Sequence, residues 1–323
     1  MNKHGVVPAL IALFAVSVPC AGFAQQAEKM FRIGWLTSQP PAAPGTAYRG
    51  GPYVQRMKEL GYVEGKHYEF VLALGNGDVG KLPALAEELV RAKVDLILAG
   101  GDVAGDSVRD RNIPVVVTSC QPFEKISKLA RDGMNLTGIT CMTSELAPKR
   151  LEMFKQVVPR ARRLAVLYSP HLRYAGLETL HEQAKTFGLV LDMVPVPDAA
   201  ALEGALASIA RNRPDGITHQ PSYVLNFEFK RIAEFALKEK LPLVGPFREL
   251  VAAGGLLAYG SAGPELAQTA ADQTDRILKG GKAREMPVEQ AKRIVLTINL
   301  KTAKALGITI PHALLVRADE VIQ

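Results

Sequence analysis

The residues of this chain that could bind a small molecule lie directly after short apolar runs with the composition of buried strands. Hydroxyl, amide, thiol and aromatic groups at such positions hydrogen-bond or stack on a ligand, and glycine lets a ligand approach the backbone. In parallel sheets the carboxyl ends of the strands meet at one edge, so we expect these residues to meet in a binding site. The candidates are Thr37, Ser38, Gly101, Asp102, Ser119, Cys120, Gln121, Tyr168, Ser169, His219, Gln220, Tyr223, Phe247 and Tyr259.

Most of these candidates also have a purely structural interpretation, and the sequence leaves both interpretations open. Thr37 and Ser38 could hydrogen-bond a carboxylate, or they could cap the helix expected from Pro52. Asp102 could pair with a ligand amine or cap a helix N-terminus. Tyr223, Phe247 and Tyr259 could stack on a planar ligand or belong to the core. His219 could bind a ligand anion, although a single histidine is more often hydrogen-bonded in place.

Residues 1–24, MNKHGVVPALIALFAVSVPCAGFA, have the layout of a secretory signal peptide. Lys3 precedes an apolar run over residues 6–18, and small residues lead up to Ala24. The run is shorter than the ~20 residues that span a bilayer, so a permanent anchor is the weaker interpretation. We expect cleavage after Ala24 and a periplasmic mature protein, with lipidation at Cys20 as the alternative.

The two remaining cysteines suggest a disulfide in the first half of the chain. Cys120 and Cys141 each follow a predicted strand, and the two strands should be neighbours in one sheet. Neighbouring strands lie ~5 Å apart, which is within reach of disulfide geometry, and the periplasm is oxidising. The alternative is a pair of small buried thiols that line the cleft.

Apolar runs and helical patterns alternate along the chain, which is typical of βαβ units with parallel sheets. The first half has expected strands at 31–36, 68–73, 96–99, 115–118 and 138–140, with helices at 52–60 and 82–92. The second set has strands at 164–167, 190–194, 216–219 and 243–244, with helices at 148–157, 177–187, 199–211 and 227–239. The closing segment adds a helix at 264–279, a strand at 294–299 and a helix at 300–306. Two such sets predict an α/β fold of two doubly wound parallel-sheet lobes that face each other across a cleft.

Composition and motifs argue against several other classes of protein. The formal net charge is +7, but Lys and Arg are scattered over helical segments, so we expect no nucleic-acid partner. The six histidines are widely separated, and no spacing suits a metal. The chain has no GxGxxG after its first strand, no P-loop and no GxSxG, so we expect no cofactor and no enzymatic activity. A signal peptide stands where a two-lobed transcription regulator would carry its helix-turn-helix.

Several long segments of the sequence resemble segments of a known protein family. The chain resembles the tryptophan/tyrosine-type solute-binding proteins of ABC transporters, which have the type I periplasmic-binding fold. The likeness runs in the family's order over nearly the whole mature chain. The blocks are RIGWLTS at Arg32, ELGYVEGKHYEF at Glu59, GDVGKLPALAEELVRAKVDLILAGG at Gly77, ISKLARDGMNLTGIT at Ile126, FREL at Phe247, VAAGGLLAYG at Val251, and INLKTAKALGITIP at Ile298 with the later LLVRADEVI.

The resemblance implies two lobes that close around a ligand and are joined by three crossings near residues 144, 250 and 290. It implies an N-lobe of residues 30–143 plus 251–289 and a C-lobe of residues 144–250 plus 290–323. The expected function is the periplasmic solute-binding component of an ABC importer, with a permease and an ATPase as partners. We expect a monomer. The alternative is a soluble ligand-sensing partner of a separate membrane receptor.

The segment SCQPF, at Ser119–Phe123, departs from the small acidic-Pro turn that the family usually has after its fourth strand. Because this turn belongs to the expected cleft, the ligand of aromatic amino-acid binders does not carry over directly. The hydroxyl and aromatic candidates favour a small amino-acid-like or aromatic carboxylate ligand.

Overall fold

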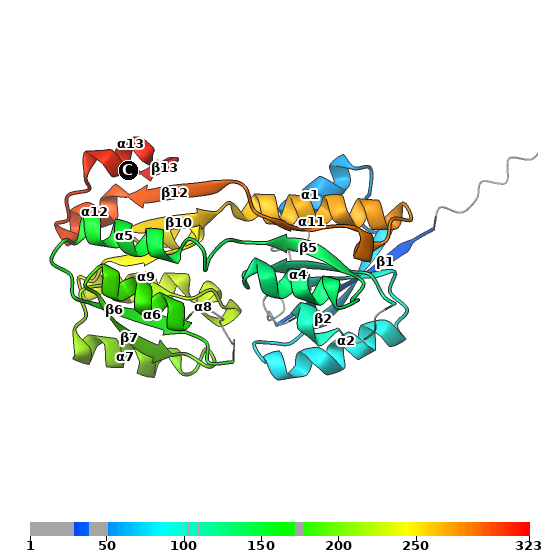
Figure 1. Ribbon diagram of the computed structural model, residues 1–323, viewed down its shortest axis with the longest axis horizontal. Helices are drawn as coiled ribbons and strands as arrows, with labels where there is room; N and C mark the ends of the chain where they lie inside the picture. Colours follow the sequence, from blue (N-terminus) through cyan, green and yellow to red (C-terminus); the bar gives the residue numbers. More distant parts are fainter. Residues whose placement is uncertain (1–28, 39–50, 102–103, 109, 111, 172–176) are drawn as a thin grey trace, which may run out of the picture.

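The computed structural model describes residues 29–38, 51–101, 104–108, 110, 112–171 and 177–323 of the chain. The described residues form two α/β lobes that lie side by side along the longest axis of the molecule (Figure 1). We call the lobe that contains the first strand the N-lobe and the other the C-lobe. The expected signal peptide with Cys20, and the candidate Asp102, lie outside the described residues. No helix among the described residues is long and apolar enough to cross a membrane.

The N-lobe is built on a six-stranded parallel sheet in the order β11-β5-β4-β3-β1-β2. Helices α1 and α11 cover one face, and α2 and α4 cover the other (Figure 1). Because both faces are covered, every residue of β3 and β5 is buried. The strands are β1 (Phe31–Thr37), β2 (Tyr68–Leu74), β3 (Leu96–Gly100), β4 (Val115–Ser119), β5 (Leu136–Thr140) and β11 (Val288–Gln290). The helices are α1 (Pro52–Glu59), α2 (Leu82–Arg91), α3 (Ala104–Ser107), α4 (Phe123–Arg131) and α11 (Gly263–Leu278).

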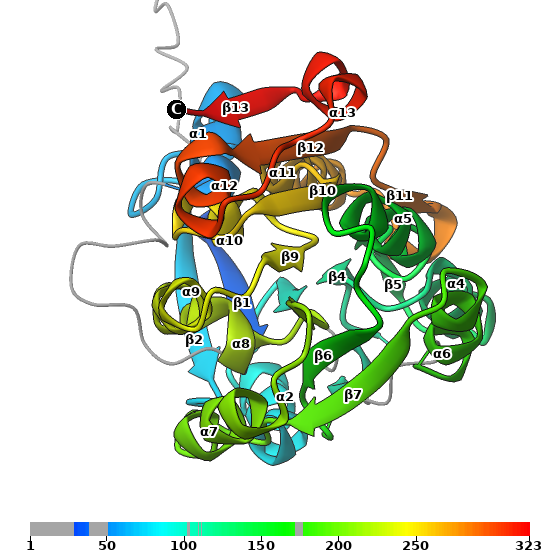
Figure 2. The same cartoon turned by 90° about the vertical axis from the view of Figure 1, so that its left-hand side faces the viewer.

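The C-lobe is built on a seven-stranded sheet in the order β13-β12-β10-β9-β8-β6-β7. Helices α5 and α6 lie on one face, and α7, α8 and α9 lie on the opposite face (Figure 2). The strands are β6 (Arg163–Tyr168), β7 (Val190–Pro195), β8 (Ile217–His219), β9 (Leu243–Gly245), β10 (Leu257–Ser261), β12 (Ile294–Asn299) and β13 (Glu320–Ile322). The helices are α5 (Ala147–Val157), α6 (Leu177–Thr186), α7 (Leu202–Asn212), α8 (Tyr223–Phe227), α9 (Phe229–Lys238), α10 (Arg248–Ala252), α12 (Leu300–Leu306) and α13 (His312–Arg317).

The alternating pattern of the sequence predicted two α/β lobes with parallel sheets, and this prediction is confirmed. The C-lobe sheet differs in one respect, because β12 runs antiparallel to β10 and the sheet is therefore mixed at that edge. The helix expected over 227–239 is α9, and a separate short helix, α8, precedes it without having been predicted. Helix α11 begins and ends close to where the sequence predicts. Pro264 lies in its first turn, and Gly280 follows its end with φ of 94°.

The chain crosses between the lobes after β5, after β10 and after β11. The boundary predicted near residue 250 needs correction, because Leu257–Ser261 form β10 and pair with β9 and β12 in the C-lobe sheet. Residues 251–261 therefore belong to the C-lobe, and the second crossing begins after Ser261. The glycines that flank this segment resemble a loop, whereas its apolar centre pairs as a buried strand.

Hydrogen bonds tie the three crossings to one another. The backbone N–H of Met142 in the first crossing donates to Oγ of Ser261, 3.2 Å away, at the start of the second. The carboxylate of Glu265, in the first turn of α11, accepts from the backbone N–H groups of Lys292 and Arg293 in the third crossing, at 3.0 and 2.9 Å. The crossings therefore form one connected hinge region.

Candidate functional site

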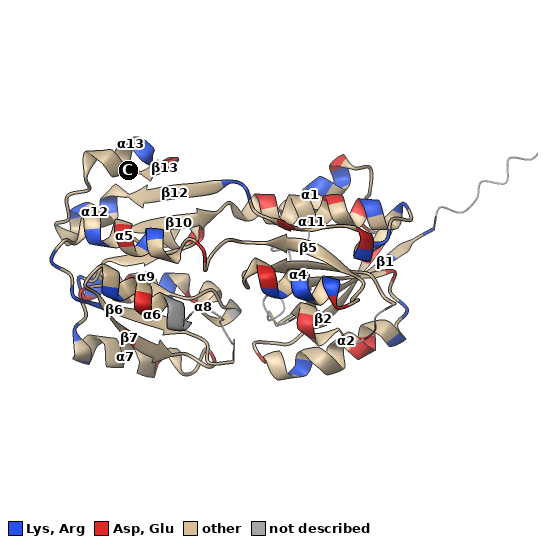
Figure 3. Cartoon of the chain, in the orientation of Figure 1, with Lys and Arg blue, Asp and Glu red and all other residues tan. Residues whose placement is uncertain are grey.

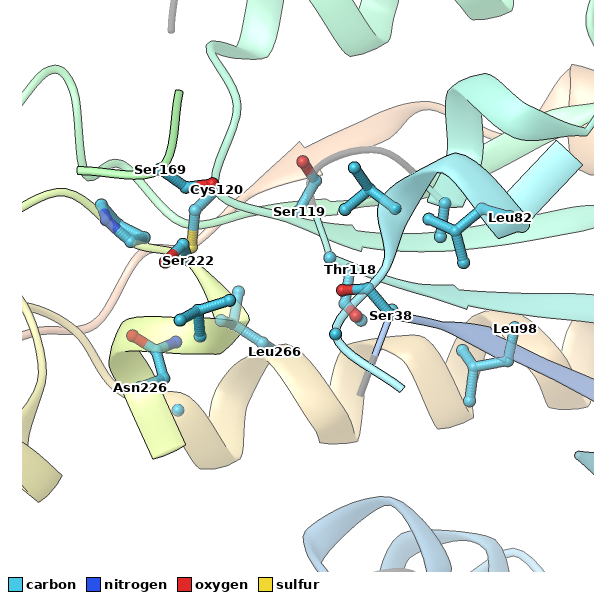
Figure 4. Close-up of a pocket in the computed structure, with 18 of the residues that line it drawn as sticks. Ser38, Leu82, Leu98, Thr118, Ser119, Cys120, Ser169, Ser222, Asn226 and Leu266 are labelled. Carbon is cyan, nitrogen blue, oxygen red and sulfur yellow. The ribbon is translucent and has the colours of Figure 1, made fainter. Parts of the chain in front are cut away.

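A cavity of about 310 Å³ lies between the lobes, at the carboxyl ends of strands from both sheets. Figure 4 shows Ser169, Ser222 and Asn226 of the C-lobe on one side of it and Ser38, Thr118 and Ser119 of the N-lobe on the other. Loops and helix starts converge at this edge of a parallel sheet, which is where ligands bind in open α/β folds. The volume is at the lower end of the ~300–1,000 Å³ of small-molecule pockets.

The N-lobe wall of the cavity is largely apolar. Trp35 comes from the middle of β1, Leu98 from β3 and Leu82 from the start of α2. Leu266 and Ala270 come from α11, which packs against β3, β4 and β5. Trp35, Leu98, Leu266 and Ala270 come from the α11 side of the sheet, and an apolar wall of this kind suits a planar apolar group.

Trp35 belongs to an aromatic cluster that includes Tyr53, which also lines the cavity. Trp35 meets Tyr53 and Phe70 edge to face, with ring centroids 6.0 and 5.2 Å apart. The hydroxyl of Tyr53 hydrogen-bonds Oγ1 of Thr274 in α11 at 3.0 Å, which joins α1 to α11. Burial raises the pKa of Tyr53 far above its usual range, so its hydroxyl stays neutral at physiological pH.

The polar groups of the N-lobe follow β1, β3 and β4. Ser38 and Ser119 are buried, and Thr118 is half-buried. Oγ of Ser119 accepts a hydrogen bond from the backbone N–H of Gln121 at 3.0 Å, which fixes the turn after β4. Gly101 follows β3 with φ of 99°, a conformation that favours glycine, and it also lines the cavity.

The C-lobe side of the cavity is more polar. Ser169 and His171 follow β6, and Phe247 follows β9. Ser222 caps α8, because its Oγ accepts from the backbone N–H of Leu225 at 3.2 Å. Asn226, one turn further along α8, lines the cavity, and its buried Oδ1 has no hydrogen-bond partner among the described residues.

Of the described residues that line the cavity, none is Asp, Glu, Lys or Arg. Many charged side chains lie instead on outer helices such as α4, α5 and α11 (Figure 3). Within the described ranges, no group of three or more His, Cys, Asp or Glu residues could hold a metal ion. The described wall therefore offers hydrogen bonds and apolar contact.

Cys120 and Cys141 are joined by a disulfide at the edge of the cavity. Their Cα atoms are 4.8 Å apart, and they directly follow the paired residues Ser119 of β4 and Thr140 of β5. The Thr143 hydroxyl donates to Sγ of Cys141 at 2.8 Å. Since Cys120 lines the cavity and Cys141 begins the first crossing, the bridge connects the binding surface to the hinge region.

The cavity brings together only part of the set of candidates from the sequence. Those that line it are Ser38, Gly101, Ser119, Cys120, Ser169 and Phe247. The side chain of Tyr223 and all of Asp102 lie outside the described structure. Six other candidates do not line the cavity, and their surroundings explain why.

Three of these six are buried at or just after the ends of strands. Thr37 is completely buried within β1, and Gln121 is buried in the turn after β4. Gln220 is buried after β8, where its backbone N–H donates to the carbonyl of Leu167 at 2.8 Å. In each case the residue type suited a ligand, but the residue is buried outside the cavity lining.

Two aromatic candidates outside the cavity pack within the C-lobe. Tyr259 lies in β10 and contacts the hydrophobic core under α5. Tyr168 ends β6 opposite Pro195 of β7 and is half-buried.

His219 is a core residue in this structure. It is 1% exposed, and its ring lies 5.1 Å from the ring of Phe229 and 6.2 Å from that of Phe247. Nδ1 lies 3.3 Å from the carbonyl oxygen of Gln220. Desolvation by burial lowers the pKa of His219 to about 4, with the nearby Arg150 charge as a smaller cause. The imidazole is therefore neutral at physiological pH.

Sequence reasoning missed the residues of the cavity that do not follow strands. Trp35 lies in mid-strand, and Tyr53, Leu266 and Asn226 lie on helices. A rule based on strand ends cannot find such positions. Ser222 did carry a signal, because serine at the start of a helical segment is a common N-cap.

A family model described as ABC transporter substrate binding protein matches residues 47–322. No curated protein matches the chain.

Solved structures share the fold over most of the chain. A conserved domain protein from Vibrio cholerae has 24% identity and a TM-score of 0.81, covering 91% of this chain and 100% of that one. An ABC domain from Streptococcus pneumoniae in complex with L-Trp has 22% identity and a TM-score of 0.79 over the same shares. A ligand-free, open substrate binding protein with adhesive properties from Clostridium difficile has 20% identity and a TM-score of 0.61, covering 91% and 99%.

Proposed function

This chain belongs to the family of ABC transporter substrate-binding proteins, and we propose that its ligand is a small amino-acid-like or aromatic carboxylate. Members of this family bind a solute without transforming it, and we propose that the cavity is the site that binds it. The observation that carries the proposal is the position of the cavity, which is lined by both lobes at the carboxyl ends of their strands.

The two sides of the cavity support this class of ligand. The apolar wall of Trp35, Leu98 and Leu266 suits an aromatic or aliphatic group. The hydroxyls of Ser169 and Ser222 face it from the C-lobe and suit a polar end group (Figure 4). A similarly folded protein from Streptococcus pneumoniae binds L-Trp, which combines these two chemical features.

Closure of the lobes would let the importer distinguish the ligand-bound protein from the empty protein. A ligand that contacts both lobes binds the closed form better than the open form, and it shifts the population by that difference in affinity. The connected hinge region, with Ser261 and Glu265 at its centre, would bend during this change. We propose that the closed form docks on the permease of an ABC importer, whose ATPase drives uptake, and that the mature chain works in the periplasm.

A ligand screen tests the proposal. The chain from Gln25 onward would be purified, and amino acids, aromatic acids and other small carboxylates would be screened by thermal shift. A ligand at a hundred times its dissociation constant should add about 2.7 kcal/mol to the free energy of unfolding, which raises Tm by several degrees. Mass spectrometry after denaturation would identify small molecules that co-purify.

A saturable shift with a carboxylate from either class would support the proposed ligand. If no member of the screen shifts Tm and nothing is released on denaturation, the ligand class is wrong. A role as the ligand-sensing partner of a membrane receptor would then be the better hypothesis.

A further inference from the structure

The side-chain oxygen of Asn226 makes no hydrogen bond to the described part of the chain. Its backbone N–H bonds the carbonyl of Ser222 at 2.9 Å, and α8 is already capped by the Ser222 hydroxyl. Oδ1 is buried without a partner, and Asn226 is the only cavity-lining residue among those described with such an atom. Asparagine is also unfavourable inside a helix. An unpaired buried amide destabilises a protein unless something else supplies its partner.

Helix α11, on the N-lobe side of the cavity, offers no such partner from its described lining residues. Helix α8 lies on the side of the C-lobe that faces the N-lobe (Figure 1), and Asn226 is labelled on the cavity wall in Figure 4. The α11 residues of the N-lobe that line the same cavity are Gly263, Leu266, Ala267 and Ala270, whose side chains are apolar or absent. Closure of the lobes onto α11 would bury the amide further without giving it a hydrogen bond.

The amide is free to turn toward a bound molecule. The last torsion of an asparagine side chain is broad and roughly twofold, so rotation exchanges the positions of Oδ1 and Nδ2. Oδ1 has no hydrogen bond among the described residues that this rotation would have to break. Asn226 can therefore present either its acceptor or its donor to the cavity, and the ligand decides which one is used.

We propose that Asn226 is a specificity-determining residue, whose amide oxygen accepts a hydrogen bond from a donor at the polar end of the ligand. This inference rests on the proposed function. It favours one of the two ligand classes, because the ammonium of an amino acid supplies that donor and a simple aromatic carboxylate does not. The carboxylate of the ligand would then bind the hydroxyl and backbone donors around Ser169 and Ser222.

Two matched probes test the proposal by isothermal titration calorimetry at pH 7. L-Tryptophan carries the ammonium group, and indole-3-propionate has the same ring and carboxylate without it. The native chain should bind L-tryptophan at least tenfold more tightly. In Asn226→Leu this preference should fall to about one, whereas Asn226→Asp should keep or increase it, because a carboxylate only accepts hydrogen bonds. The control Asn212→Leu lies at the exposed end of α7 and should change neither affinity.

Other results would overturn the role of Asn226. An unchanged preference in Asn226→Leu would show that the amide does not contact the donor. A tenfold loss of L-tryptophan binding in Asn226→Asp would show that Asn226 donates to the ligand carboxylate instead.

A measurement without ligand separates this inference from the proposed function. If the native chain binds neither probe, the proposed ligand class fails, and the Tm of the ligand-free proteins decides the role of Asn226. If the amide is unpaired in the ligand-free protein, Asn226→Leu removes a buried polar group that has no partner. The Tm of this variant should then exceed that of the native chain by roughly 2 °C or more. A lower Tm would mean that Asn226 has a structural role, and the inference would be wrong.

Discussion

Arg150 donates a hydrogen bond from Nη2 to the carbonyl oxygen of Thr143 at 2.7 Å, so a buried side chain of α5 holds the first crossing between the lobes. Nη1 of the same guanidinium donates to the carbonyl of Tyr259 at 3.3 Å, two residues before Ser261, which ends β10 and precedes the second crossing. Burial lowers the pKa of Arg150 to about 10, which leaves it charged at neutral pH. One cation therefore fixes the C-lobe ends of two crossings.

The variant Arg150→Met tests this connection, because methionine retains part of the apolar stem and removes both donors. We expect the free energy of unfolding to fall by about 2–4 kcal/mol, since two buried carbonyl groups lose a charged partner. Urea denaturation at pH 7 measures it. The control Arg162→Met, at an exposed position, should change stability by less than about 0.5 kcal/mol. Equal effects of the two variants would contradict a role for Arg150 in the hinge region.

The disulfide between Cys120 and Cys141 should stabilise the oxidised protein. The two cysteines are 21 positions apart, and closing a loop of this size adds about 3 kcal/mol in the chain-entropy model. The double variant Cys120→Ser/Cys141→Ser should therefore unfold at lower urea concentration than the native chain. Native protein treated with a reductant should approach the stability of the variant.

Thiol counting checks the bridge directly. The mature chain, denatured without reductant, should contain no free thiol, and two free thiols would show that the bridge is absent. In that case the native chain and the double variant should also respond equally to reductant.

The sequence predicted the central strands of both sheets well, because strands such as β3, β5 and β8 are buried on both faces and appear in the sequence as short apolar runs. Strands β10, β11 and β13 were not predicted, and β10 was missed for a local reason. Its apolar residues are flanked by Gly255 and Gly260, which resemble a loop, and only pairing with β9 and β12 identifies the segment as a strand. That pairing depends on residues far along the chain.

The cavity was predictable where its residues follow strands and not elsewhere. Ser38, Ser119 and Ser169 were found because the carboxyl ends of parallel strands converge. Trp35 and Leu266 come from a strand interior and from the face of a helix, so they face the cavity only through the packing of α11 on the sheet. Local patterns contain no information about that packing.

His219 should make the protein sensitive to acid. Its pKa is about 4 in the folded state, because burial disfavours the charged ring, and about 6.5 in the unfolded chain. Between these values the unfolded state binds more protons than the folded state, so stability is complete above pH 6.5 and falls as the pH decreases toward 4. The full loss from this group is about 3 kcal/mol.

Urea titrations at pH 7 and pH 4.5 measure this effect. The variant His219→Gln should lose less stability between the two pH values than the native chain does. The variant His312→Gln, at an exposed position in α13, should behave like the native chain. If His219→Gln keeps the full acid dependence, other groups cause it.

Two glycines should respond oppositely to the same substitution. Gly138 in β5 has φ of 155°, and a Cβ atom there would collide with the backbone carbonyl of Val117 in β4, so Gly138→Ala should destabilise the protein by about 3 kcal/mol. Gly204 lies inside α7, and a Cβ atom there meets nothing within 4 Å. Gly204→Ala should therefore stabilise the protein by about 0.5–1 kcal/mol, because alanine loses less backbone entropy in a helix. Thermal unfolding of both variants compares them directly, and destabilisation by Gly204→Ala or tolerance of Gly138→Ala would contradict the packing described for these positions.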